Sequence, residues 1–227
     1  VARHIKNEDQ GFKVYFLQIE ERKTYCIRAE KIILAVPIHI ISKIAEDLLP
    51  QNWFDKKQYP HAPWMVGNIL IKSEFFQSIN EDVFWDNVLY SGKSLGYVHS
   101  EHQLIQTSIG GKTTFTWYQP LTDKLPTQAR MEAYSKSAEE WKSLLFIELS
   151  KMHPEIEQFI ELIEFKIWGH GMILPIPDLI WGENHRKMKN EIVPNMFFAH
   201  TDFSGISIFE QAFYQGVEAA KRTLSNT

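Results

Sequence analysis

Apolar and polar residues alternate along the first forty positions in a pattern that predicts short strands. Lys13–Ile19 and Thr24–Arg28 read as two paired strands joined by a charged turn, and Val1–Ile5 reads as part of another strand. Lys31–Pro37 is apolar from its second residue onward and closes with proline. A continuous apolar run of this length is typical of a strand that is buried on both faces.

The middle of the chain alternates predicted helices and strands, without repeats or low-complexity segments. After a helix over 38–49 that stops at Pro50, strands are predicted at Trp64–Lys72, Val83–Tyr90, Leu95–His99, Thr113–Tyr118 and Phe165–Trp168. The longest helix is predicted over Arg130–Met152, with an apolar stripe formed by Tyr134, Ala138, Trp141, Leu145 and Leu149. This order predicts an α/β protein with a mixed sheet flanked by helices.

Near the C-terminal end, a buried strand runs into a polar turn and then into a helix. The strand and turn are Met196–Asp202, and a helix begins within the following residues. Ser207 is a predicted N-cap, and Glu210 three residues later completes a capping box. Because the first helical N–H groups and the positive end of the helix dipole point beyond the strand, this arrangement is typical of anion binding.

Composition and charge exclude several functional classes. The 227 residues are 44% hydrophobic and 23% charged, as in globular proteins, and the net charge of −4 with scattered Lys and Arg gives no reason to expect nucleic acid. No apolar run approaches the roughly 20 residues that a membrane span requires. The single Cys26 excludes an internal disulfide and suits a reducing, cytoplasmic location.

The C-terminal segment resembles the signature of the flavin-containing amine oxidase superfamily. In that family an apolar strand, Ala-Gly and an acidic turn precede a helix that reads roughly Glu-Gly-Ala-x-x-Ser-Gly-x-x-Ala-Ala. Here the strand ends in Phe197-Phe198-Ala199, and the helix reads Glu-Gln-Ala-Phe-Tyr-Gln-Gly-Val-Glu-Ala-Ala from Glu210. His200 and Gln211 stand where the family usually has glycine, which allows close backbone approach.

The N-terminal segment carries a second match to the same family. There a β-meander followed by an apolar strand ending Ala-x-Pro marks the exit from the FAD domain, and Ala35-Val36-Pro37 fits this pattern. The resemblance implies three parts. They are an FAD-domain meander and apolar strand at 1–37, an inserted substrate-binding domain at 38–190, and the FAD-domain strand and helix at 191–227.

The Gly-x-Gly-x-x-Gly loop with which the family begins, and which cradles the FAD pyrophosphate, is absent from this sequence. We therefore expect the chain to be the C-terminal half of a larger FAD-dependent oxidoreductase, inactive by itself. Its expected partners are the N-terminal dinucleotide-binding half of the same protein and a small-molecule substrate.

The resemblance implies which residues contact the cofactor. Asp202, with Thr201 in the same turn, corresponds to the acidic residue that hydrogen-bonds the FAD ribityl chain. Ile208 and Phe209, next to Ser207, correspond to positions whose backbone N–H groups face the flavin N1/C2 carbonyl edge. Such a helix terminus stabilises the negative charge that develops there on reduction. Strand residues at the start of the chain, Val1 or Ala2, correspond to the backbone contact with adenine.

Candidate catalytic residues come from two predicted strands. Trp168 and His170 lie in Trp-Gly-His-Gly, where the family often brings an aromatic residue toward the flavin. Asn68 shares a strand face with Trp64 and Val66. Many amine oxidases have a lysine near flavin N5 on this strand, but Val66 or Gly67 occupies that position here.

Two interpretations follow. The first is an FAD-dependent oxidoreductase that takes a hydride from a substrate C–N or C–C bond. The second is a non-catalytic module that keeps the flavoprotein fold and binds a ligand or partner, which the missing lysine and the two replaced glycines favour. No metal site is predicted, because His99-x-x-His102 lacks a third ligand.

Overall fold

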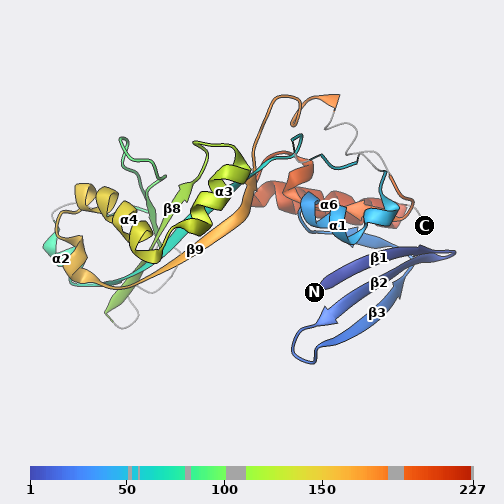
Figure 1. Cartoon of the computed structure of the whole chain (residues 1–227), viewed down its shortest axis with the longest axis horizontal. Helices are drawn as coiled ribbons and strands as arrows, with labels where there is room; N and C mark the ends of the chain where they lie inside the picture. Colours follow the sequence, from blue (N-terminus) through green and yellow to red (C-terminus); the bar gives the residue numbers. More distant parts are fainter. Residues whose placement is uncertain (51–52, 56, 80–82, 101–110, 184–191, 226–227) are drawn as a thin grey trace. The chain divides into compact units, whose positions relative to one another are not determined.

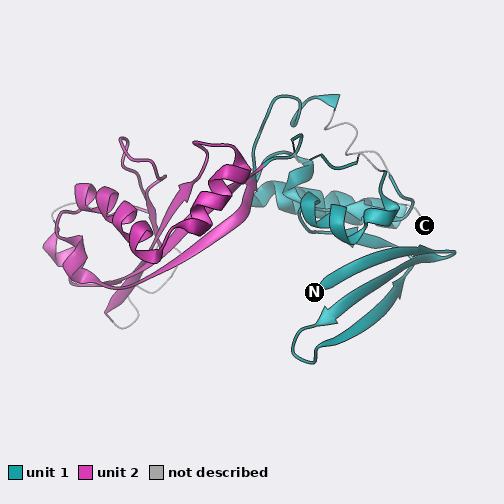
Figure 2. Ribbon diagram, viewed as in Figure 1, with its two compact units in different colours: residues 1–60, 173–227 teal, residues 61–172 magenta. Residues whose placement is uncertain are grey.

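The computed structural model describes residues 1–50, 53–55, 57–79, 83–100, 111–183 and 192–225. The chain forms two compact units (Figure 2). Unit 1 comprises residues 1–60 and 173–227, and unit 2 comprises residues 61–172. His102 and the predicted domain end at Asn190 lie outside the described residues.

Unit 1 contains a three-stranded antiparallel meander (Figure 1) of β1 (Ala2–Glu8), β2 (Gly11–Gln18) and β3 (Lys23–Ala29). The alternating pattern of β1 and β2 directs Ile5 and Phe12 into the core of the unit, where both are almost completely buried. Gly11 opens β2 at a φ of +122°, and a Cβ there would collide with the backbone of Ala29. The meander therefore requires glycine at this position.

The second sheet of unit 1 has two parallel strands, β4 (Ile32–Leu34) and β10 (Met196–Phe198). The described residues of unit 1 also form α1 (Ile38–Ile44), η1 (Glu46–Leu48), η4 (Thr201–Phe203) and α6 (Phe209–Ser225). α1 buries its apolar residues Ile38, Ile41 and Ile44 in one cluster with Ile32 and Leu34 of β4.

Unit 2 is built on a five-stranded sheet of order β6-β7-β8-β5-β9. Its strands are β5 (His61–Lys72), β6 (Asp86–Asn87), β7 (Tyr97–His99), β8 (Lys112–Pro120) and β9 (Ile160–Ile173), whose last residue belongs to unit 1. The helices in its described residues are α2 (Phe75–Ser78), α3 (Pro126–Ser135), α4 (Ala138–Met152) and η3 (Ile156–Phe159).

Alternation along the strands of unit 2 gives the sheet one covered face and one open face. On β5, Met65, Ile69 and Ile71 are fully buried and pack with Leu145 and Leu149 of α4. The residues between them on β5, and their partners on β8, are more exposed. We call the side of the sheet opposite α3 and α4 the open face of unit 2.

The helix predicted over Arg130–Met152 is two helices, and this expectation is corrected. α3 ends at Ser135, and Ser137 begins α4 as an N-cap. The Ser137 hydroxyl accepts the Glu140 N–H, and the Glu140 carboxylate accepts the Ser137 N–H, which forms a capping box. The predicted apolar stripe hid this break, because its members Tyr134 and Ala138 lie on either side of it; both are exposed, and Trp141, Leu145 and Leu149 are the buried members of the stripe.

The mixed α/β class predicted from the sequence is confirmed, while the two compact units divide at other positions than those expected. The inserted part was expected at 38–190, whereas unit 2 comprises 61–172. α1 belongs to unit 1 because its buried isoleucines pack on β4 and β1. Among the described residues, no helix combines the length and the apolar character that crossing a membrane requires.

Candidate functional site

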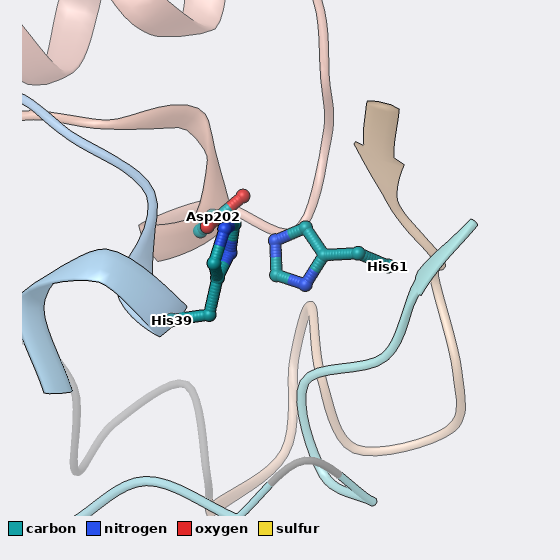
Figure 3. A group of neighbouring side chains, drawn as sticks. All are labelled: His39, His61 and Asp202. Carbon is teal, nitrogen blue, oxygen red and sulfur yellow. The ribbon is translucent and has the colours of Figure 1, made fainter. Parts of the chain in front are cut away.

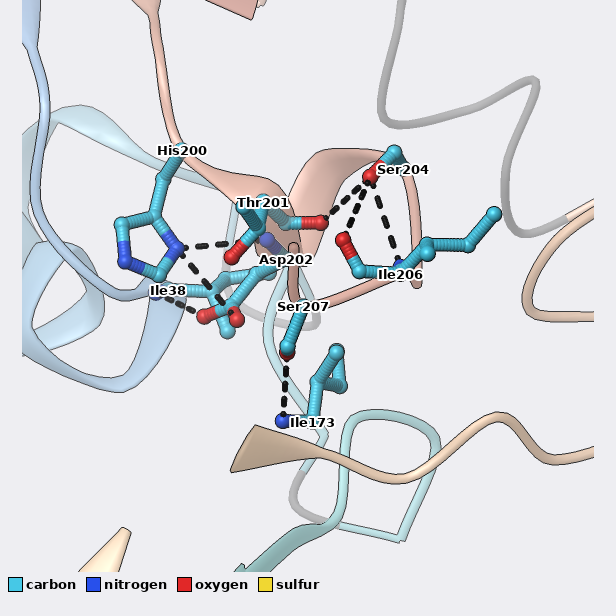
Figure 4. A network of polar contacts seen from close by, with 8 residues as sticks. All are labelled: Ile38, Ile173, His200, Thr201, Asp202, Ser204, Ile206 and Ser207. Carbon is cyan, nitrogen blue, oxygen red and sulfur yellow. Dashed lines mark hydrogen bonds and ion pairs between the residues drawn. The ribbon is translucent and has the colours of Figure 1, made fainter. Parts of the chain in front are cut away.

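The strand–turn–helix segment predicted near the C-terminal end is present in unit 1 as β10, η4 and α6. β10 is held beside β4 in parallel, and the Ala199 N–H continues the pairing by donating to the Leu34 carbonyl at 3.0 Å. The turn that follows is closed by the Ser204 hydroxyl, which donates to the Thr201 carbonyl at 2.8 Å (Figure 4). Gly205 then takes a φ of +71°, where a side chain would be strained.

Asp202 is the buried acidic group of this turn, with 2% of its surface exposed. Its Oδ2 accepts the backbone N–H of Ile38 at 2.9 Å, and its Oδ1 lies 3.3 Å from Nδ1 of His200 (Figure 4). The same His200 nitrogen lies 3.2 Å from the Asp202 N–H and can accept it. One nitrogen cannot carry a proton toward the carboxylate and accept the amide proton at once, so these two contacts are alternatives.

The bond to Ile38 gives Asp202 a structural task. Ile38 is the first residue of α1, and Pro37 before it offers no side-chain cap. A carboxylate at this place satisfies one of the unpaired N–H groups of the helix and interacts favourably with the helix dipole. Asp202 therefore joins the turn after β10 to the start of the helix after β4.

His39 is a further titratable group of unit 1 near this carboxylate, and its ring lies beside Asp202 (Figure 3). The ligand atoms of His39 and Asp202 are within 4.8 Å of each other. Figure 3 also draws His61, which is the first residue of unit 2.

The N-cap of α6 lies one residue after the predicted Ser207. The helix begins at Phe209, and its first bond runs from the Ala212 N–H to the Ile208 carbonyl, so Ile208 holds the N-cap position. The Ser207 hydroxyl instead accepts the backbone N–H of Ile173 at 3.2 Å. Ile208 and Phe209 are exposed, and the N–H groups of the first turn have no partner within the helix.

The other predicted cofactor contacts also lie in unit 1. Thr201 is in η4, and its carbonyl accepts from Ser204 and Gly205. Ala2 starts β1 and pairs with Phe16, and the Val1 carbonyl accepts the Leu17 N–H at 2.8 Å. The Val1 amine also donates to the Leu17 carbonyl at 2.7 Å, so the backbone of Val1 is engaged at the edge of the meander.

The three predicted catalytic residues lie in unit 2, on strands β5 and β9. Asn68 is exposed on the open face, where its Oδ1 accepts the Thr116 hydroxyl at 3.0 Å. Trp168 is 55% exposed, and its neighbour Ile167 packs into the core, which directs Trp168 to the open face. His170 is exposed further along β9, with its ring 6.0 Å from that of His61.

Val66 and Gly67, at the position where the sequence comparison expects a lysine, lie on opposite faces of β5. Gly67 faces α4, and a Cβ there would meet the side chains of Phe165 and Leu145 at 3.2–3.3 Å. Gly67 therefore lets β9 and α4 approach the strand closely, and Val66 is the residue of this pair that faces away from the helices.

The open face carries a polar and aromatic group that the sequence did not single out. The Tyr118 hydroxyl donates to Asp86 Oδ1 at 2.9 Å, and the Tyr118 ring lies beside that of Trp64, with centroids 6.4 Å apart and planes 19° apart. Burial, followed by the Asp86 carboxylate, raises the pKa of Tyr118 to about 12. The Trp64 indole N–H is buried and has no acceptor among the described residues. Strand alternation at 113–118 placed Tyr118 on one face, but nothing in the sequence paired it with Asp86.

Comparisons with known proteins bear on the fold. Neither protein-family models nor curated protein sequences gave a match. Among solved structures, cyclohexylamine oxidase from Brevibacterium oxydans IH-35A superposes with a TM-score of 0.69 and 12% identity, over 100% of this chain and 48% of that one. A protein of Pyrococcus furiosus (TM-score 0.48, 10% identity, 95% and 46%) and the rebeccamycin biosynthetic enzyme RebC (0.43, 15%, 95% and 35%) are also similar. This chain spans about half the length of cyclohexylamine oxidase and has the fold of that half.

Proposed function

We propose that this chain is the C-terminal half of an FAD-dependent oxidoreductase of amine oxidase type. In this proposal unit 1 binds the flavin, and the open face of unit 2 binds the substrate. A bound flavin would supply the acceptance of a hydride from a substrate C–N or C–C bond, with dioxygen or another acceptor reoxidising it.

The observation that carries the proposal is the β10–η4–α6 segment. It ends in a helix whose first-turn N–H groups have no partner within the helix, next to the exposed residues Ile208 and Phe209. Donors at a helix N-terminus stabilise negative charge on a bound group. The similarity to half of cyclohexylamine oxidase over the whole chain supports the same assignment.

The residues of this segment fit a flavin. The Asp202 carboxylate accepts hydrogen bonds, which is the chemistry that a ribityl hydroxyl requires. Thr201 and Ser207 border the same turn, and the backbone of Val1 or Ala2 is the proposed adenine contact. Within unit 2, Asn68, Trp168 and His170 are the proposed substrate contacts, because all three lie exposed on β5 or β9.

The proposed partner is an N-terminal dinucleotide-binding half. Parallel sheets are normally larger than two strands and covered on both faces, whereas β4 and β10 form a two-stranded parallel sheet and Ile33 is 44% exposed. α6 likewise presents one exposed face, the α6 stripe, made of Phe209, Phe213, Ala220 and Leu224. Further βα units would cover these surfaces. We also propose that the protein is located in the cytoplasm.

One alternative has a specific observation in its favour. Asp202 already stabilises the start of α1, so its burial is explained without a cofactor. His200 also places a side chain, in contact with Asp202, where the family usually has glycine. A module that keeps this fold and binds a ligand or partner without flavin is consistent with both.

The test is the visible absorption spectrum of the protein purified from its whole reading frame, with any released chromophore identified by mass. Bound FAD, weakened at least about tenfold by Asp202→Asn and unchanged by the exposed control Asp9→Asn, is the expected result; a tenfold loss equals about 1.4 kcal/mol. A colourless protein that does not take up added FAD would contradict the oxidoreductase and leave the non-catalytic module.

A further inference from the structure

The two edges of the unit 2 sheet differ in length. β6 at one edge is the short strand Asp86–Asn87, whereas β9 at the other edge runs from Ile160 to Ile173 (Figure 1). Among the described residues, no strand pairs with the outer side of β9. An exposed edge is a template for another strand, and proteins normally block it by a short strand, a proline or a bulge. β9 is long and contains no proline, so this edge is open to pairing.

The middle of β9 directs apolar and charged side chains to opposite faces. Ile163, Phe165 and Ile167 pack on the core of unit 2, on the covered face. Glu164 and Lys166 alternate with them and are exposed, so they point to the open face. Within the part of the chain that the structure describes, neither of these two charges forms an ion pair. The strand therefore carries one negative and one positive group on either side of Phe165.

This spacing is complementary to itself. If two copies of β9 pair antiparallel around a two-fold axis at Phe165, Glu164 of each copy lies opposite Lys166 of the other. On the covered face, Ile163 then lies opposite Ile167. Residues directly opposite each other across antiparallel strands interact, so this register has two attractive charge pairs. An axis at Glu164 or at Lys166 would instead set two like charges opposite each other, which is destabilising.

The covered face beside this edge also offers apolar surface. A groove of about 420 Å³ lies between α4 and β9, and Phe146, Ile163 and Phe165 are among the residues that line it. These three side chains are only partly buried. A second copy paired with β9 would cover part of their exposed surface with its own Ile163 and Phe165. Burial of this apolar surface would add to the backbone hydrogen bonds and the charge pairs.

We propose that this chain forms a symmetric dimer in which the β9 strands of two copies join their sheets, in the register that sets Glu164 opposite Lys166. A strand from a different protein would not supply these reciprocal charges. The proposal goes beyond the function proposed above. It requires only residues of unit 2 and no flavin, so dimer formation and FAD uptake are tested separately.

The experiment is sedimentation of the whole chain over a series of concentrations, which gives the dissociation constant of the dimer. We expect the wild type to dimerise. Glu164→Lys and Lys166→Glu should each weaken the dimer at least about tenfold, because each sets two pairs of like charges opposite each other. The double variant that exchanges both charges should dimerise like the wild type. An equimolar mixture of the two single variants should also form a dimer, since each then meets the opposite charges.

The matched control is Glu155→Lys, which makes the same change of charge at an exposed residue outside β9 and should leave the dimer unchanged. A wild type that stays monomeric at all concentrations would overturn the proposal. A dimer that ignores both single charge reversals, as association through the α6 stripe would, also overturns it. Failure of the double variant to dimerise, while it is folded by circular dichroism, would contradict the register.

Discussion

The two units differ in how completely they bury their own apolar surface. In unit 2, α4 turns Trp141, Leu145 and Leu149 into a core that is closed by the sheet, and all three are at most 4% exposed. In unit 1, α6 leaves its large apolar side chains exposed: Phe209, Phe213 and Leu224 of the α6 stripe are 66–78% exposed. Unit 2 thus has the features of a complete layer structure, whereas unit 1 offers an apolar surface to something else.

The buried carboxylates of the two units differ in the segments that they connect. In unit 2, Glu148 accepts hydrogen bonds from Ser94, from the backbone N–H of Lys93 and from the Trp117 indole. In unit 1, Asp202 accepts the Ile38 N–H and lies against His200 in the turn that precedes α6. Glu148 therefore holds residues 93–94 and Trp117 against α4, whereas Asp202 holds the turn after β10 against the start of α1.

The largest effect is expected from truncating a buried side chain in the core of unit 2. Leu145→Ala should lower the free energy of unfolding by about 2–5 kcal/mol, because it removes a fully buried side chain between α4 and β5. Urea unfolding followed by tryptophan fluorescence measures this change. The exposed control Ile147→Ala on the same helix should change stability by less than about 0.5 kcal/mol. Equal effects at both positions would mean that the core of unit 2 is not closed.

A smaller effect is expected at Glu148. Glu148→Gln should lower the free energy of unfolding by about 1–3 kcal/mol at neutral pH, since a buried set of donors loses its charged acceptor. Burial raises the pKa of Glu148, but the hydrogen bonds from Ser94, Lys93 and Trp117 outweigh burial and hold the pKa below its ordinary value of 4.5.

The sign of the pH dependence follows from that lowered pKa. The stabilisation by the carboxylate is fully present above the unfolded pKa of about 4.5 and is lost as pH falls through the folded pKa. The stability difference between the wild type and Glu148→Gln should therefore shrink in acid, as urea midpoints at a series of pH values would measure. An exposed control, Glu139→Gln, should show no such trend. A stability difference for Glu148→Gln that stays constant with pH would show that the charge of the Glu148 carboxylate does not stabilise the fold.

The smallest effect is expected on the α6 stripe. Phe213→Ser should change the stability of this chain by less than about 0.5 kcal/mol, because the side chain is 66% exposed. It should also lower self-association at high protein concentration, measured by sedimentation velocity, since it removes an exposed apolar group. Destabilisation as large as that of Leu145→Ala would show that the stripe is packed within the chain and would remove the contrast between the units.

Much of the fold followed from local patterns. Alternation predicted the meander and the strands β5, β8 and β9, and the Met196–Asp202 run predicted the β10 turn. The predictions were wrong at the N-termini of two helices, α4 and α6. The Ser137 capping box was concealed within the apolar stripe of α3 and α4, and the Ser207–Glu210 spacing suggested a cap that the helix does not use.

Several features of the sites depended on contacts between distant segments. Asp202 binds Ile38, 164 residues away, and Tyr118 binds Asp86 across the intervening strand β7. Hydrophobic periodicity reports which side of an element is buried, but it carries no information on which residue of another element lies opposite. The sequence by itself determined the α/β class, most strands and the polar turn before α6. Only the tertiary structure decided that Asp202 stabilises α1, that Ser207 is engaged by Ile173, and that Asp86 accepts the Tyr118 hydroxyl, because strand register and packing bring those groups together.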